Sequence, residues 1–180
     1  QWVLHRLATL DKTVRDGYSN YDFQHVFQQL FQFCTVDLST IYFDIRKDAL
    51  YCNSKNELTR RSSRTLLDIL FRRLTTWLAP MLVFTMEDVW LTRFKEENTS
   101  VHLEDIPKIK EDWSNPELDK KWKTIRSVRR VVTGAIEIER REKNIGASLE
   151  AAPIIFIEDA TDFEIINTQN FADICITSSV

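Results

Sequence analysis

The feature that most constrains the fold is a run of apolar residues recurring every three or four positions between residues 23 and 45. This spacing places side chains on one face of an α-helix. Further apolar residues at Val26, Phe33 and Tyr42 widen that face, and so broad an apolar surface is typical of a helix buried on more than one side in a bundle. We therefore predict a long helix from about Asp22 to Lys47 or beyond. The main stripe consists of Phe23, Phe27, Leu30, Cys34, Leu38, Ile41 and Ile45.

Two neighbouring stretches show the same helical periodicity. Residues 3–18 carry apolar side chains at steps of three and four, and Gly17 is typical of a helix end. Asn20 is then the predicted N-cap of the long helix. Another helix is expected from about Glu57, and Pro80 must end or kink it because proline lacks an amide hydrogen and clashes with the preceding turn.

The second half of the helical region has clearer start and stop signals. Residues 85–88 resemble a capping box and predict a short helix that runs through Trp90. Residues 95–116 lose the periodicity and are expected to form a loop. The pair Asn115-Pro116 predicts the start of a last long helix, with proline at its first position. Gly146, after Ile145, is expected to end that helix.

The character of the chain changes after Pro153. Residues 154–157 and 174–176 are β-branched runs, which favour strands, and a short helical stretch is expected around 163–166. The predicted fold class is therefore mainly α: a helical bundle over residues 1–150, followed by the start of a small C-terminal α/β unit over 151–180. The chain opens on Gln1 rather than Met, and we interpret it as a piece of a longer protein.

Charge is unevenly distributed along the chain. The net charge is −3, yet residues 55–73 contain six Lys or Arg against two acids, and residues 117–143 contain nine against five. Residues 150–180 contain six acids and no Lys or Arg. A polyanion such as RNA can bind the helical part even though the whole chain is acidic. The alternative interpretation is that these charges only solvate the outer faces of helices.

The residues needed for several kinds of site are missing. The three glycines are too scattered for a phosphate-binding glycine loop, and the three histidines have no metal-ligand spacing to one another or to cysteine. The three cysteines are too few for a disulfide framework, which favours a reducing, cytoplasmic setting. No apolar run has the length of a membrane span. This stretch by itself does not indicate a catalytic domain or a metal site.

Several longer strings are more specific than helical periodicity. YDFQHVFQQLFQFCTVDLSTIYFDIRKDALYC (21–52) strongly resembles the helical anticodon-binding domain of class I aminoacyl-tRNA synthetases. LAPMLVFTMEDVW (78–90), SVHLEDIP (100–107) and WVLHRL (2–7) are similar to other segments of that family. AIEIERREKNIGASLEA (135–151) resembles the isoleucine enzymes in particular. The resemblance covers nearly the whole chain, in order.

The resemblance implies a parent enzyme that joins isoleucine to its tRNA with ATP and Mg²⁺, and that has zinc in a further C-terminal region. The HIGH and KMSKS signatures of the family's catalytic fold do not occur here. This chain is therefore expected to lack the catalytic and editing sites and to need no cofactor of its own. Its expected partners are the anticodon stem-loop of tRNA(Ile) and the catalytic domain of the parent chain, in a monomeric enzyme. A valine- or leucine-type synthetase and a non-catalytic helical interaction scaffold remain as alternatives.

Proteins read RNA loops by stacking unpaired bases on aromatic or guanidinium planes and by holding phosphates with cations. Each candidate also has a structural alternative, namely an intramolecular ion pair with Asp44 or Asp48 or a charge at a helix end. Trp77, Trp90 and Trp122 follow the apolar stripes and are expected in the core. The first-choice RNA contacts are Arg46, Lys47, Arg60, Arg61 and Arg64, with Tyr51 as a stacking residue; the second choices are Arg129, Arg130, Arg140 and Lys143.

Overall fold

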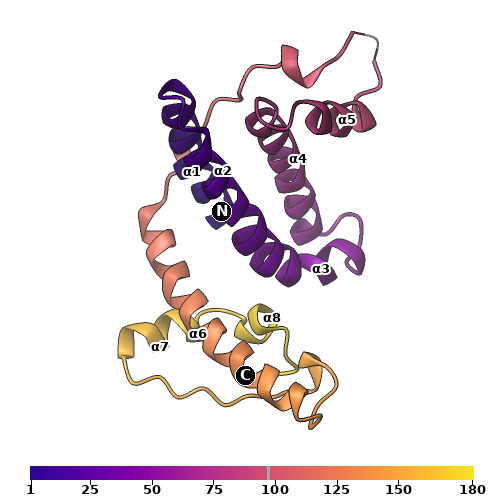
Figure 1. The fold of residues 1–180 in the computed structure, drawn as a ribbon. Helices are drawn as coiled ribbons and strands as arrows, with labels where there is room; N and C mark the ends of the chain where they lie inside the picture. The colour runs from indigo at the N-terminus through magenta and orange to yellow at the C-terminus, as the bar shows by residue number, and fades with distance from the viewer. Residues whose placement is uncertain (97) are drawn as a thin grey trace. The chain divides into compact units, whose positions relative to one another are not determined.

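The computed structural model describes residues 1–96 and 98–180, and it confirms a mainly helical fold (Figure 1). No strand occurs within these described ranges. The chain forms two compact units, one of Gln1 with Val3–Ser114 and one of Trp2 with Asn115–Val180. The helical bundle expected from the sequence is present, and each unit is described separately below.

The first helix of unit 1, α1 (Trp2–Ser19), buries the face that the sequence predicts, formed by Val3, Leu7, Leu10 and Val14. Gly17 does not end α1, however. It lies inside the helix, where a Cβ atom would stand 2.3 Å from Cγ2 of Val26, so glycine is needed for the close approach of the next helix. The predicted cap Asn20 is also wrong, because Asp22 accepts the capping hydrogen bond from the amide of His25 at 3.1 Å.

The long helix predicted from Asp22 is present as three continuous segments: α2 (Phe23–Gln32), the π-helix η1 (Phe33–Phe43) and α3 (Asp44–Tyr51). Its buried face differs from the prediction at the beginning. Val26 and Leu30 are buried as predicted, whereas Phe23 and Phe27, which the predicted stripe includes, are 43% and 46% exposed. Both faces have helical spacing, so packing against α1 and not periodicity decides between them. The exposed aromatic residues at this end are Tyr21, Phe23, Phe27 and Phe31.

The helix expected from Glu57 is α4 (Leu58–Leu78), and Pro80 lies in the turn that follows it, as predicted. The next helix, α5 (Val83–Arg93), begins before the expected capping box, which is therefore wrong. The Glu87 carboxylate instead accepts hydrogen bonds from the Ser100 hydroxyl (2.9 Å) and the Val101 amide (3.0 Å). These bonds attach the 3₁₀ turn η2 (Val101–Leu103) to α5. A second turn, η3 (Glu111–Trp113), lies in the expected loop.

Unit 2 is built on α6 (Pro116–Arg141), which begins as predicted. The Asn115 side chain caps it by accepting from the Leu118 amide at 2.9 Å. The predicted end at Ile145-Gly146 is wrong, since α6 stops four residues earlier. Lys143, with φ 63°, takes the left-handed position instead, and the bonds Lys143 N to Arg140 O and Asn144 N to Glu139 O form a Schellman motif.

The two predicted strands of unit 2 are also wrong in the described structure. Residues 154–157 are extended without a partner strand, and Ile174 and Cys175 are buried in α8 (Phe171–Cys175). A strand needs a neighbour to pair its backbone, and here Ile174 lies in a helix that packs on α6, which overrides the β-branched preference. The short helix expected around 163–166 is present as α7 (Ala160–Asn167), and the turn η4 (Ser148–Glu150) precedes the extended segment.

Candidate nucleic-acid interface

The first-choice cations lie on either side of the loop that joins α3 to α4 in unit 1 (Figure 1). Arg60 holds this loop together, because its Nη1 donates to the backbone carbonyl of Asn53 at 2.6 Å. The side-chain amide of Asn53 donates in turn to the Glu57 carboxylate. Helices α3 and α4 also pack against each other beside this loop. Burial raises the pKa of Tyr42 on η1, although its interactions with Ser63 and with the nearby Arg46 charge act in the opposite direction. The Arg60 contacts and the packing of the two helices hold the corner in place.

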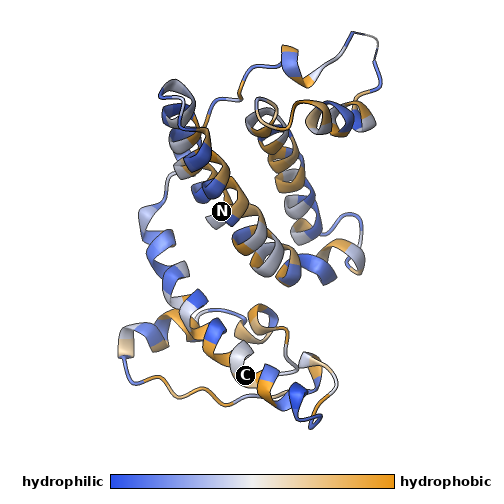
Figure 2. Ribbon diagram, in the orientation of Figure 1, coloured by the Kyte–Doolittle hydropathy of each residue, from blue (hydrophilic) through white to orange (hydrophobic). Residues whose placement is uncertain are grey.

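The remaining first-choice residues face solvent. Arg46 and Lys47 on α3 and Arg61 and Arg64 on α4 are exposed, and the Tyr51 side chain is 81% exposed at the end of α3. In the part of the chain that the structure describes, no hydrogen bond or ion pair occupies the guanidinium of Arg61 or Arg64. These groups can meet phosphates without losing an internal contact, and an open tyrosine ring can stack on a base. Figure 2 shows this region as largely hydrophilic.

Arg129, one of the second choices on α6, has a structural position. It is 9% exposed, and its Nε donates to the Ile174 carbonyl at 2.8 Å, which fixes α8 to α6. Its neighbour Arg130 is exposed. A guanidinium held in this way has little surface left for an external phosphate, so the geometry favours the structural alternative for Arg129 and leaves Arg130 open.

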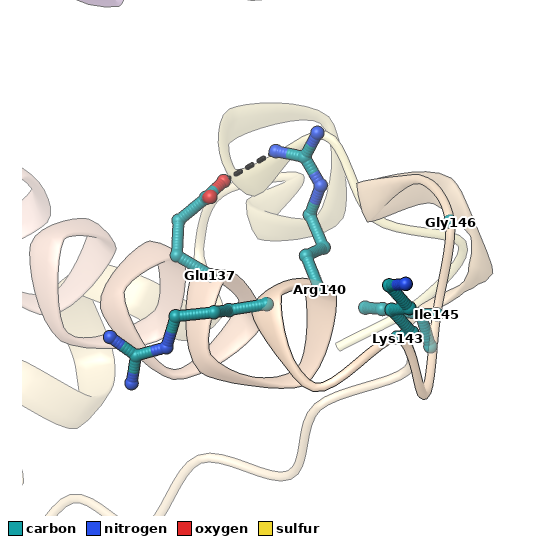
Figure 3. Close-up of a pocket in the computed structure, with 6 residues that line it drawn as sticks. Glu137, Arg140, Lys143, Ile145 and Gly146 are labelled. Carbon is teal, nitrogen blue, oxygen red and sulfur yellow. Dashed lines mark hydrogen bonds and ion pairs between the residues drawn. The ribbon is translucent and has the colours of Figure 1, made fainter.

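Arg140 and Lys143 lie together at the end of α6, where they line a shallow cavity of about 420 Å³ with Ile145 and Gly146 (Figure 3). Glu137 pairs with the Arg140 guanidinium at 2.5 Å, as the dashed line in Figure 3 shows. Lys143 stands in a left-handed conformation that disfavours any residue with a Cβ atom. The Lys143 side chain leaves the backbone at the turn that ends α6 and is exposed there.

A comparison with known protein families shows to which family the chain belongs. Residues 1–155 match the family described as "Anticodon-binding domain of tRNA ligase". The chain belongs to this family. Its curated relatives include proteins named isoleucine–tRNA ligase from Agrobacterium fabrum, 53% identical over 178 residues, and from Ruegeria pomeroyi, 54% identical over 180 residues. These alignments cover 99% and 100% of this chain but only 18% of each relative.

The structure gives three arginines positions that the sequence alone did not indicate. Arg73 belongs to the basic run 55–73 but is buried, where it bonds the Pro107 and Lys108 carbonyls at 2.9 and 2.7 Å. Arg93 on α5 lies outside that run, yet its ion pair with Asp68 brings it to α4. Arg141 also lines the cavity at the end of α6; it belongs to the basic run 117–143 but was not among the candidate contacts.

Other kinds of site have no counterpart in the described residues. No group of His, Cys, Asp or Glu there is arranged to hold a metal ion. The buried Cys175 is a poor nucleophile, because burial raises the pKa of its thiol to about 11, and the Arg129 charge only partly offsets this. None of the described helices combines the length and apolar character that crossing a membrane requires. Trp77 and Trp90 are in the core, as predicted, and Trp122 is half-buried.

Proposed function

We propose that this chain is the anticodon-binding region of an isoleucine–tRNA ligase and that it contacts the anticodon stem-loop of tRNA(Ile). The observation that carries the proposal is the family match over residues 1–155, together with isoleucine–tRNA ligases about half identical to the chain over nearly its whole length. The open cations beside the α3–α4 loop support it, because RNA binding requires cationic groups that are free to neutralise phosphates.

The proposed contact surface in unit 1 consists of Arg46, Lys47, Tyr51, Arg61 and Arg64, supported by the loop that Arg60 holds. Unit 2 carries a separate set of proposed RNA contacts, namely Arg130, Arg140 and Lys143. The cations fix the register on the RNA backbone, and Tyr51 stacks on an unpaired base. Arg129 is left out of this surface because its guanidinium is committed to the Ile174 carbonyl.

Joining isoleucine to tRNA with ATP and Mg²⁺ is proposed to take place in polypeptide outside this chain, since the chain spans about a fifth of its relatives. Under this proposal the parent is a cytoplasmic monomer with a zinc module elsewhere, and its catalytic domain is the second partner of this chain. The exposed aromatic face of α2, with Phe27 and Phe31, supports a protein contact of this kind, since large apolar side chains open to water favour docking.

The test is a titration of the chain with an RNA hairpin that carries the anticodon stem-loop of tRNA(Ile), and with an unrelated tRNA hairpin, at several salt concentrations. The logarithm of the affinity should fall with the logarithm of the salt concentration, with a slope of several units if several phosphates are contacted. The substitution Arg61→Glu should weaken binding and lower the slope by about one. The matched control is Lys12→Glu, an exposed cation of α1 outside the proposed surface.

Two results would contradict the proposal. Equal, weak binding to every hairpin would favour a non-catalytic scaffold, because a decoding module must respond to the anticodon. Isoleucine transfer to tRNA by this chain alone would show that the chemistry is not located elsewhere.

A further inference from the structure

A groove with an apolar floor lies in unit 1 between the end of η1 and the middle of α4. Leu67, Phe71 and Leu74 of α4 line it, and Phe43, the last residue of η1, also contributes to the lining. Its volume is about 460 Å³, and Arg64 also lines it. The groove thus begins at a residue of the proposed RNA-binding surface and continues that surface toward α5.

The aromatic side of this groove is open to a ligand. Phe43 is 38% exposed, and its ring meets Tyr42 edge-on with the ring centres 5.6 Å apart. Leu38 and Ile41 of η1 are buried in the core, and α3, which continues η1, packs on α4, so the backbone that carries Phe43 is held in place. An exposed ring on a rigid support is a suitable stacking platform, because little conformational freedom is lost when a planar ligand binds.

The other side of the groove carries a second cation. The Arg93 guanidinium lies 4.8 Å from the centre of the Phe71 ring and forms an ion pair with Asp68. Arg64 lies three residues after Arg61, so the two project from neighbouring positions on α4. Asp68 also lines the groove, so the groove combines an apolar floor, an aromatic ring, the open Arg64 guanidinium and the Arg93–Asp68 ion pair.

This combination fits single-stranded RNA, whose bases present apolar faces and whose backbone presents phosphates. We propose that the groove receives one unpaired base of the anticodon loop, which stacks on Phe43 while Arg64 contacts the adjoining phosphate. This inference rests on the proposed function and assigns it a base-binding site. An acidic amphipathic helix is the competing occupant, since such helices also fill apolar grooves.

The test uses the chain with the tRNA(Ile) anticodon hairpin and the substitution Phe43→Leu, which keeps an apolar side chain but removes the ring. A stacked base contributes about 1–3 kcal/mol, so Phe43→Leu should weaken binding by about 5- to 150-fold. The control is Phe31→Leu, which alters an exposed phenylalanine of the same unit on α2. Circular dichroism and thermal melting of both variants establish that the fold is retained.

A hairpin in which one loop base is replaced by an abasic sugar identifies the base. At the position that occupies the groove, the abasic hairpin should bind weakly to the unaltered chain, and Phe43→Leu should cause no further loss. The emission of a fluorescent base analogue at that position should change when the unaltered chain binds, and it should change less with the Phe43→Leu variant.

The outcomes separate the groove from the proposed function. If Phe43→Leu and Arg64→Glu bind the hairpin as the unaltered chain does, and binding still depends on salt and anticodon, the groove assignment is wrong and the proposed function stands. If an acidic amphipathic peptide binds the groove and Phe43→Leu weakens only that binding, the groove is a protein-docking site and the inference is overturned. If the unaltered chain binds no anticodon hairpin, both fail.

Discussion

Replacement of Arg73 by methionine should strongly destabilise unit 1. Arg73 is 4% exposed, and its guanidinium donates to the Pro107 and Lys108 carbonyls while it lies 4.8 Å over the Trp113 ring. Its Nη1 is also 4.0 Å from the buried Asp11 carboxylate. Burial lowers the pKa of Arg73, and the Asp11 charge opposes this shift. The residue therefore ties the 104–113 loop to both α1 and α4.

The expected loss in the free energy of unfolding follows from the buried groups that Arg73→Met leaves without a partner. Hydrogen bonds to a charged group contribute about 1.5–3 kcal/mol each, and removal of one partner of a buried ion pair costs about 3–5 kcal/mol. The contributions overlap because they share one guanidinium, and the Asp11 contact is long. Arg15 also remains on Asp11 at 2.7 Å and limits the loss. We expect Arg73→Met to lower the free energy of unfolding by about 3–5 kcal/mol.

The measurement is urea unfolding followed by circular dichroism, with Arg72→Met as the matched control. Arg72 is the adjacent arginine of α4, but its side chain is 46% exposed. Its ion pair with the half-exposed Asp68 is long, at 3.8 Å, so the loss of Arg72 should cost less than about 1 kcal/mol. Equal destabilisation by the two substitutions would refute the reasoning, because it would mean that the buried carbonyl contacts of Arg73 add nothing. If Arg73→Met does not fold, Arg73→Lys supplies the same comparison with the charge retained.

Three further predictions concern the backbone and a tyrosine. Gly17→Ala should lower the free energy of unfolding by about 1–3 kcal/mol because the new Cβ atom would overlap Val26. Gly134→Ala, where nothing lies within 4 Å of the new Cβ atom, should raise it by about 0.5–1 kcal/mol. Similar effects of the two substitutions would contradict the close packing at Gly17. Lys143→Gly should stabilise the chain by about 1 kcal/mol, because glycine adopts the left-handed backbone without strain, and it should weaken hairpin binding. Lys143→Ala should weaken hairpin binding without stabilising the chain. Unchanged binding by both variants would remove Lys143 from the proposed RNA contacts. Burial raises the pKa of Tyr18 to about 12, and its hydroxyl donates to the Trp77 carbonyl. The unfolded chain therefore loses this proton first, so stability should fall as the pH rises from about 10 to 12, and Tyr18→Phe should reduce that fall in unfolding titrations at each pH.

The sequence by itself determined the elements that depend on neighbours in the chain. The apolar spacing of Leu7, Leu10 and Val14 predicted the buried face of α1, Pro80 predicted a break, and Asn115-Pro116 predicted the start of α6, because periodicity and capping act over only a few residues. The family strings likewise identified the class of domain. The basic runs located the candidate interface approximately, since charge composition is visible without a fold.

Tertiary structure alone decided which of these residues face solvent and which serve the core. Arg73 and Arg129 belong to basic runs, yet carbonyls 34 and 45 residues further along the chain hold their guanidinium groups. Packing of α2 buries Val26 and leaves Phe27 exposed, although both have helical spacing. Ile174 lies in a helix against α6 despite its preference for strands. In each case the deciding contact is distant in sequence, so local pattern carries no information about which of two physically acceptable arrangements the chain adopts.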